Sequence, residues 1–85
     1  MTAYFYILSC SDGTFYTEVT HDLVNRVGEH IEGLNPSAYT YSRRPVKLVH
    51  YETFDTIEQA LKRWSELART TRWKKSEMLK IGLGK

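Results

Sequence analysis

The chain has 85 residues, of which 41% are hydrophobic and 13% aromatic, and its formal net charge is +2. That length allows one domain, residues 1–85, and that composition excludes wholesale disorder. A single cysteine excludes an internal disulfide framework, and no stretch has the pattern of a signal peptide or a membrane span, so we expect a protein of the reducing cytoplasm.

Residues 4–20 predict two aromatic-rich strands joined by a tight turn, because Asp12-Gly13 between apolar runs is a strong hairpin signal. The first strand, residues 4–10, is apolar on both faces. This pattern is typical of a strand that is covered on both sides, so we place it in the middle of its sheet. Cys10 is then expected to be a buried thiol rather than a nucleophile.

The length of the hairpin loop decides which side chains share a face. A two-residue loop would put Tyr6 and Tyr16 on opposite faces of the sheet. A three-residue loop with Gly13 in the left-handed region would pair Tyr6 with Glu18 and put both phenols and the carboxylate on one face. The residues alone permit both registers.

Residues 22–32 predict a helix, because Leu23, Val27 and Ile31 form an apolar stripe four residues apart. Asp22 suits the first turn and Gly33 suits the end. Two polar residues of this segment, Arg26 and His30, are also four apart and would stack on one flank. An exposed and unremarkable surface pair is the alternative.

The next segment, residues 34–45, has the turn residues of a loop. It contains Tyr39, Tyr41, Arg43 and Arg44, a mixture that suits stacking on and contacting a nucleic acid. Tyrosines that anchor the loop onto the sheet are the alternative reading. Residues 46–54 then predict a third strand, with one face formed by Val46, Leu48, His50, Glu52 and Phe54.

A capping box opens the last helical region, with Thr56 at the N-cap and Gln59 three residues later. The expected apolar face, which points Trp64 at the core, consists of Ile57, Ala60, Leu61, Trp64, Leu67 and Ala68. Thr70-Thr71 should end this helix and begin another over residues 72–80. The order β-β-α-β-α-α predicts an α+β fold, with a small three-stranded antiparallel or mixed sheet flanked by helices.

Charge is distributed unevenly along the chain. Residues 1–42 contain one cation against five acids, whereas residues 43–85 contain eleven Lys or Arg against five acids. A basic half of this kind, which includes Lys74 and Lys75, can follow a polyanion through phosphate contacts. A solvated helical surface is the alternative.

The aromatic array in this order resembles the GIY-YIG nuclease domain, in particular its small stand-alone UPF0213-type bacterial members. The resemblance runs from about Tyr4 to Leu79, and the matching segments are Tyr4-Phe5-Tyr6, Tyr16-Thr17-Glu18, Asp22-Leu23, Arg26, His30, Tyr39-Thr40, Arg43-Arg44-Pro45-Val46 and Ala60-Leu61. The family's sheet has both motif tyrosines facing one cleft, which selects the three-residue hairpin loop.

The resemblance implies a phosphodiester-cleaving site with one divalent metal. In the family a helix glutamate holds the metal, a motif tyrosine helps to activate water, and an arginine stabilises the charge on the phosphate. Carried over by position, the catalytic residues are Tyr6 and Tyr16 as the motif tyrosines, Arg26 as the arginine and His30 as the polar residue one turn further on.

Two positions depart from the family pattern. Glu18 replaces the glycine of the second motif, and Trp64 replaces the metal-binding glutamate expected four residues after Ala60. An indole cannot bind Mg²⁺ or Mn²⁺, since these ions require oxygen ligands. We therefore expect Trp64 to fill the former metal pocket and Glu18 to oppose phosphate entry, or to pair with Arg26.

These departures leave three hypotheses. The first is a GIY-YIG endonuclease-like domain that is catalytically impaired, needs no cofactor and still binds DNA or another nucleic acid. The second is an active endonuclease that uses Mg²⁺ or Mn²⁺ with Glu18 as the substitute ligand. The third is a protein-interaction module that uses Tyr39, Tyr41 and Trp73.

Overall fold

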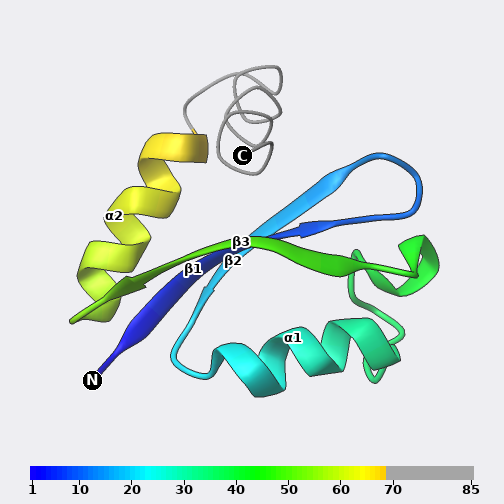
Figure 1. Cartoon of the computed structure of the whole chain (residues 1–85), viewed down its shortest axis with the longest axis horizontal. Coiled ribbons are helices and arrows are strands. Elements are labelled where there is room, and N and C mark those ends of the chain that lie inside the picture. Colours follow the sequence, from blue (N-terminus) through cyan, green and yellow to red (C-terminus); the bar gives the residue numbers. More distant parts are fainter. Residues whose placement is uncertain (69–85) are drawn as a thin grey trace.

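The computed structural model describes residues 1–68 and contains one three-stranded antiparallel sheet in this range. The strand order is β2 (Phe15–Thr20), β1 (Ala3–Ser9), β3 (Lys47–Phe54). Helix α1 (Leu23–Glu32) lies against one face of the sheet and α2 (Ile57–Ala68) against the other (Figure 1). The α+β class and the central position of the first strand are confirmed. The helix expected over residues 72–80 lies outside the described residues.

Strand β1 is central because it can bury side chains in both directions. Phe5 and Ile7 belong to the core on the α2 side, and Tyr6 and Leu8 to the core on the α1 side. All four side chains are fully buried. The alternation of apolar residues along β1 therefore holds both layers together.

The hairpin between β1 and β2 has the three-residue loop. Cys10 N donates to the Thr14 carbonyl at 2.9 Å and Gly13 N donates to the Cys10 carbonyl at 3.1 Å. Gly13 has a φ of 85°, in the region that favours glycine. The loop sets the register in which Tyr6 lies opposite Glu18.

Strand β3 does not keep one face throughout, so the expected single face was wrong. Ile7 pairs with His50 and Leu8 with Leu48, which leaves Val49 as an extra residue at a β-bulge. A bulge shifts the alternation of side chains by one residue. Leu48 consequently packs in the core on the α1 side, whereas Phe54 packs in the core on the α2 side.

Helix α1 has the expected bounds and ends. The Asp22 side chain accepts from Asn25 N, and Gly33 follows the helix with a φ of 69°. The buried face, however, runs through Leu23, Val27 and His30, because Ile31 is 48% exposed. At about 100° per residue, His30 lies about 20° from Leu23 around the helix axis and Ile31 about 80° from it.

Helix α2 begins at the predicted capping box. Gln59 N donates to the Thr56 hydroxyl at 3.3 Å, and Asp55 N donates to the Gln59 side chain at 3.1 Å. The buried positions are Ala60 and Leu67, whereas Trp64 is 38% exposed. The expectation that Trp64 points at the core was therefore wrong. Within the described range, neither helix has the length and hydropathy needed to span a bilayer.

Candidate active site

The hairpin register brings three functional side chains of the sheet together. Tyr6 pairs with Glu18 and Leu8 with Tyr16, so Tyr6, Tyr16 and Glu18 share the face of the sheet that α1 covers. Helix α1 adds Arg26 and His30 from consecutive turns to the same place. The four residues predicted as catalytic are therefore neighbours, and Glu18 lies among them.

Arg26 and Glu18 form a bidentate ion pair at the centre of this group. Arg26 Nε lies 2.8 Å from Glu18 Oε1, and Arg26 Nη2 lies 2.9 Å from Glu18 Oε2. The Tyr6 hydroxyl donates to Oε1, and the Tyr16 hydroxyl donates to Oε2 at 3.1 Å. Arg26 Nη1 also donates to Glu29 Oε1 at 3.0 Å. Both carboxylate oxygens of Glu18 are thus engaged within the chain.

These contacts fix the charge state of the group. Burial of the Glu18 carboxylate raises its pKa, but hydrogen bonds from Arg26, Tyr6 and Tyr16 outweigh burial and lower the pKa to about 2. Burial and then the hydrogen bond to Glu18 raise the pKa of the Tyr6 phenol. Near neutral pH, Glu18 is therefore an anion, Arg26 a cation and Tyr6 a neutral phenol.

His30 is buried beneath this ion pair. Its Nδ1 lies 2.6 Å from Oγ1 of Thr40, a residue that is 1% exposed. Its Nε2 has no hydrogen-bond partner and lies 3.6 Å from Glu18 Oε1. Burial and the nearby Arg26 cation lower the pKa of the imidazole below its usual value. His30 is therefore neutral near pH 7, and Thr40 fixes how its ring is placed.

The segment between α1 and β3 packs its aromatic residues onto the site. The Tyr39 ring stacks on Tyr16 with centroids 5.9 Å apart, and the Arg43 guanidinium lies 3.8 Å from the Tyr39 centroid. Arg43 Nε also lies 3.0 Å from Asp12 Oδ2 in the hairpin loop. Arg43 and Tyr39 therefore connect the hairpin, the loop and the site, which for Tyr39 matches the alternative in which the loop tyrosines anchor the loop onto the sheet.

Arg44 connects the same segment to the end of α1. Its Nη1 donates to the Glu32 carbonyl at 3.3 Å and its Nε donates to the Tyr41 carbonyl at 2.9 Å. The guanidinium also lies 4.7 Å from the Tyr41 ring centroid. Nucleic-acid contacts by these four loop residues stay a prediction, and Lys74 and Lys75 lie outside the described residues.

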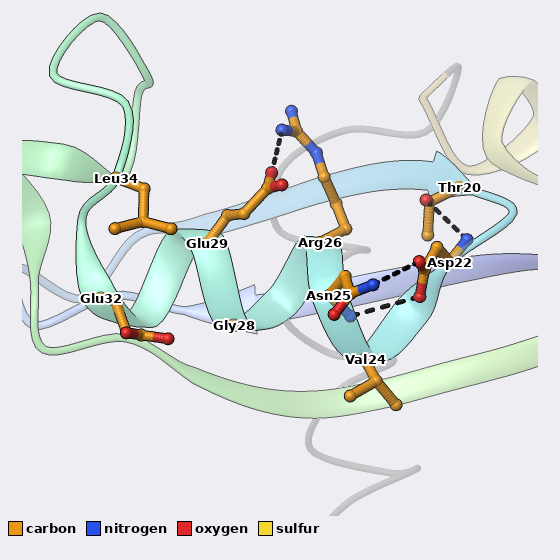
Figure 2. A pocket seen from close by; sticks show the side chains of 9 residues that line it. All are labelled: Thr20, Asp22, Val24, Asn25, Arg26, Gly28, Glu29, Glu32 and Leu34. Carbon is orange, nitrogen blue, oxygen red and sulfur yellow. Dashed lines mark hydrogen bonds and ion pairs between the residues drawn. The ribbon is translucent and has the colours of Figure 1, made fainter.

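An open hollow of about 590 Å³ runs along α1 next to the site. Arg26 and Glu29 lie on its lining, together with Val24 and Leu34 (Figure 2). Figure 2 also shows the hydrogen bonds that tie Asp22 to the first turn of the helix. Arg26 thus belongs both to the lining of this hollow and to the cluster around Glu18.

The model of the GIY-YIG catalytic domain matches residues 2–77. The chain belongs to the GIY-YIG domain family. A UPF0213 protein from Syntrophus aciditrophicus is 44% identical over 77 residues, which cover 91% of this chain and 88% of the relative. Another UPF0213 protein, from Haloquadratum walsbyi, is 46% identical over 79 residues, which cover 93% of this chain and 88% of the relative.

Solved structures agree with the family. The solution NMR structure of a UPF0213 protein from Bacillus halodurans matches with a TM-score of 0.65 and 34% sequence identity. The match covers 99% of this chain and 88% of the Bacillus halodurans chain. A solution NMR structure of a protein from E. faecalis matches with a TM-score of 0.63 and 37% sequence identity. That match covers 95% of this chain and 85% of the E. faecalis chain. The GIY-YIG assignment therefore rests on sequence and on fold together.

Trp64 lies apart from Glu18, and its filling of a former metal pocket stays a prediction. The Trp64 indole donates from Nε1 to Thr17 Oγ1 at 3.0 Å. Thr17 alternates with Tyr16 and Glu18 along β2, so its side chain lies on the α2 side of the sheet. The two departures from the GIY-YIG pattern therefore lie on opposite sides of strand β2.

The residues that the structure describes do not fit the divalent metal that the GIY-YIG family implies. Within residues 1–68, no group of three or more His, Cys, Asp or Glu is placed to hold an ion. Glu18 already receives hydrogen bonds from Arg26 and both tyrosines, and Glu29 receives one from Arg26. A cation entering there would also meet the guanidinium of Arg26 at close range.

Sequence reasoning missed two members of the site. Glu29 follows Arg26 by three residues, a spacing at which helix side chains meet, so the sequence held a signal for this second acidic partner. Thr40 carried no such signal as a partner of His30, because the contact spans a loop. Only the folded chain shows that a hydroxyl orients the imidazole.

Proposed function

We propose that this chain is a GIY-YIG nuclease-like domain that binds nucleic acid and does not cleave it. The observation that carries the proposal is the bidentate pairing of Arg26 with Glu18. The family assigns this arginine to the growing charge of a phosphate. In this chain the Glu18 carboxylate accepts hydrogen bonds from the two N–H groups of Arg26 that would otherwise bind the phosphate. It also offsets the positive charge of Arg26.

Support for nucleic-acid binding comes from the charge distribution. Residues 1–68 contain six Lys or Arg against nine acids, whereas residues 69–85 contain six against one. A short stretch with this excess attracts phosphates and loses affinity as salt rises. Cys10, the single cysteine, is a buried free thiol, which suits a protein of the reducing cytoplasm. Nucleic acid is present in that compartment.

Binding is tested by fluorescence anisotropy with a labelled oligonucleotide at increasing salt. We expect the logarithm of affinity to fall linearly with the logarithm of salt concentration, because phosphate contacts release counterions. A variant in which Lys74 and Lys75 are both changed to Gln should give a shallower slope. Absence of binding at low salt would reject this half of the proposal and favour a protein-interaction module.

Cleavage is tested with supercoiled plasmid in the presence of Mg²⁺ or Mn²⁺. We expect wild-type protein to leave the plasmid intact even at high protein concentration. Glu18→Ala removes the substitute ligand that the second hypothesis requires, and it serves as the matched variant. Metal-dependent nicking by wild type that disappears in Glu18→Ala would establish the active enzyme and overturn the proposal.

A further inference from the structure

The face of the sheet that α1 partly covers carries two more tyrosines beyond the site. Tyr51 on β3 pairs directly with Tyr6 on β1, so its side chain lies one strand away on the same face. Tyr4 lies two residues before Tyr6, also on this face. The Tyr4 and Tyr51 rings meet edge to face with centroids 6.5 Å apart. We call these two residues the tyrosine platform.

Tyr51 stands out among the described aromatic residues by its exposure. It is 53% exposed, compared with 42% for Tyr39, 37% for Tyr41 and 38% for Trp64. The rings of Tyr39 and Tyr41 each lie under an arginine of their own chain. The Trp64 indole is hydrogen-bonded to Thr17. Tyr51 therefore offers the most open aromatic surface of the described residues.

Electrostatics on the sheet permit a polyanion to approach the platform. The strands carry two carboxylates, Glu18 and Glu52. Glu18 is neutralised by Arg26, and Glu52 lies on the α2 side of the bulged strand in a bidentate pair with Arg63. A phosphate chain that crosses this face thus meets no unpaired carboxylate on the strands.

We propose that the tyrosine platform is a stacking site for an unpaired nucleobase, with Tyr51 as the residue that contacts the base. Stacking on sheet tyrosines is a recurrent way to hold single-stranded nucleic acid, and it is tolerant of sequence because every base has a flat face. The inference rests on the proposed function, and it adds the class of ligand: single-stranded rather than fully paired nucleic acid.

The test is anisotropy with a labelled oligo(dT) strand and with a blunt duplex of the same length. Tyr51→Ala should weaken oligo(dT) binding about tenfold, the order expected when one stacked base is lost. The duplex affinity should stay within twofold, since paired bases are not available to the ring. Tyr51→Phe keeps the ring and should bind oligo(dT) like wild type.

A matched control and a second readout keep the result interpretable. Thr53→Ala changes an exposed residue on the same face of β3 and should leave both affinities unchanged. The Tyr51→Ala to wild-type affinity ratio should be the same at low and high salt, because stacking releases no counterions. NMR should show upfield shifts of the Tyr51 ring protons when oligo(dT) binds.

The outcomes separate this inference from the function on which it rests. If wild type binds neither probe, the proposed nucleic-acid binding fails and the platform with it. If wild type binds oligo(dT), but Tyr51→Ala binds equally well and the ring protons do not shift, only the platform is rejected. An equal loss of oligo(dT) and duplex binding in Tyr51→Ala would also reject it.

Discussion

The guanidinium of Arg26 donates to both carboxylate oxygens of Glu18, at 2.8 and 2.9 Å. One residue comes from helix α1 and the other from strand β2, so the pair also fastens the helix to the sheet. Two phenols complete the hydrogen bonding of the carboxylate. The positive charge of Arg26 is therefore used within the chain, where it pairs with a carboxylate.

Acid sensitivity is the first consequence of that pair. The folded pKa of Glu18 is about 2, below the ordinary value of 4.5. A lowered folded pKa stabilises the fold above the unfolded pKa, and this stability is lost as pH falls from about 4.5 towards 2. The loss amounts to at most about 3 kcal/mol. Urea unfolding at a series of pH values, compared between wild type and Glu18→Gln, measures it.

The difference between these two proteins cancels the titration of groups far from position 18. It still includes His30, whose Nε2 lies 3.6 Å from Glu18 Oε1 and whose pKa the Glu18 carboxylate helps to set. We expect the two stabilities to differ most near neutral pH and to converge only as pH approaches about 2. A constant difference across the whole pH range would contradict the assigned charge state of Glu18.

Restoring the missing glutamate alone should not restore cleavage. In Trp64→Glu the new carboxylate starts from the α2 side of β2, whereas Arg26 stays paired with Glu18 on the other side. We expect plasmid to remain intact with Mg²⁺ or Mn²⁺, as it should for the neutral control Trp64→Gln. Nicking by Trp64→Glu that Trp64→Gln lacks would show that the Glu18–Arg26 pair does not block catalysis.

Local sequence rules predicted much of the fold because the signals lie within a few residues. The Asp12-Gly13 turn, the Gly33 helix end and the Thr56 cap each depend on neighbouring backbone geometry. The partners of Arg26 could be predicted from the sequence in part, since the hairpin loop length sets the register that places Glu18 beside Tyr6. Family resemblance selected that loop from two that the residues permitted.

The remaining features depend on contacts that no local pattern records. The bulge at Val49 moves half of β3 to the other face, and the alternation of its residues gives no sign of this. Trp64 looked like a core residue by helical spacing, and it does contact Thr17 of the sheet, but it stays 38% exposed whereas Ala60 and Leu67 are buried. A periodic pattern indicates that a helix has an apolar face, and packing decides its exact rotation.

Removing the Thr40 hydroxyl should destabilise the protein through His30. Thr40→Val keeps the shape of the side chain but leaves Nδ1 of a buried imidazole without its partner. An unsatisfied buried polar group costs about 1–3 kcal/mol. Chemical denaturation should show this loss in Thr40→Val and little change in Thr53→Val, an exposed position on β3. Equal effects of both substitutions would argue against the hydrogen bond as the cause.

The last prediction concerns the two glycines with positive φ. Gly13→Ala places a methyl group in open space, so it should cost only the backbone penalty of about 1–2 kcal/mol. Gly33→Ala has the same penalty, and its Cβ would also lie 2.4 Å from the Arg44 guanidinium. Arg44 must then move away from the Glu32 carbonyl at the end of α1. Urea unfolding should therefore show a larger loss for Gly33→Ala.

A double-mutant cycle with Arg44→Ala identifies the source of the extra loss. Once Arg44 is shortened, the methyl group at position 33 has no guanidinium to displace, and only the backbone penalty remains. Gly33→Ala should then cost about as much in the Arg44→Ala background as Gly13→Ala costs in wild type. Residues in contact give such non-additive energies, whereas independent ones add. Strict additivity of the two substitutions would show that Arg44 does not depend on the space that Gly33 leaves.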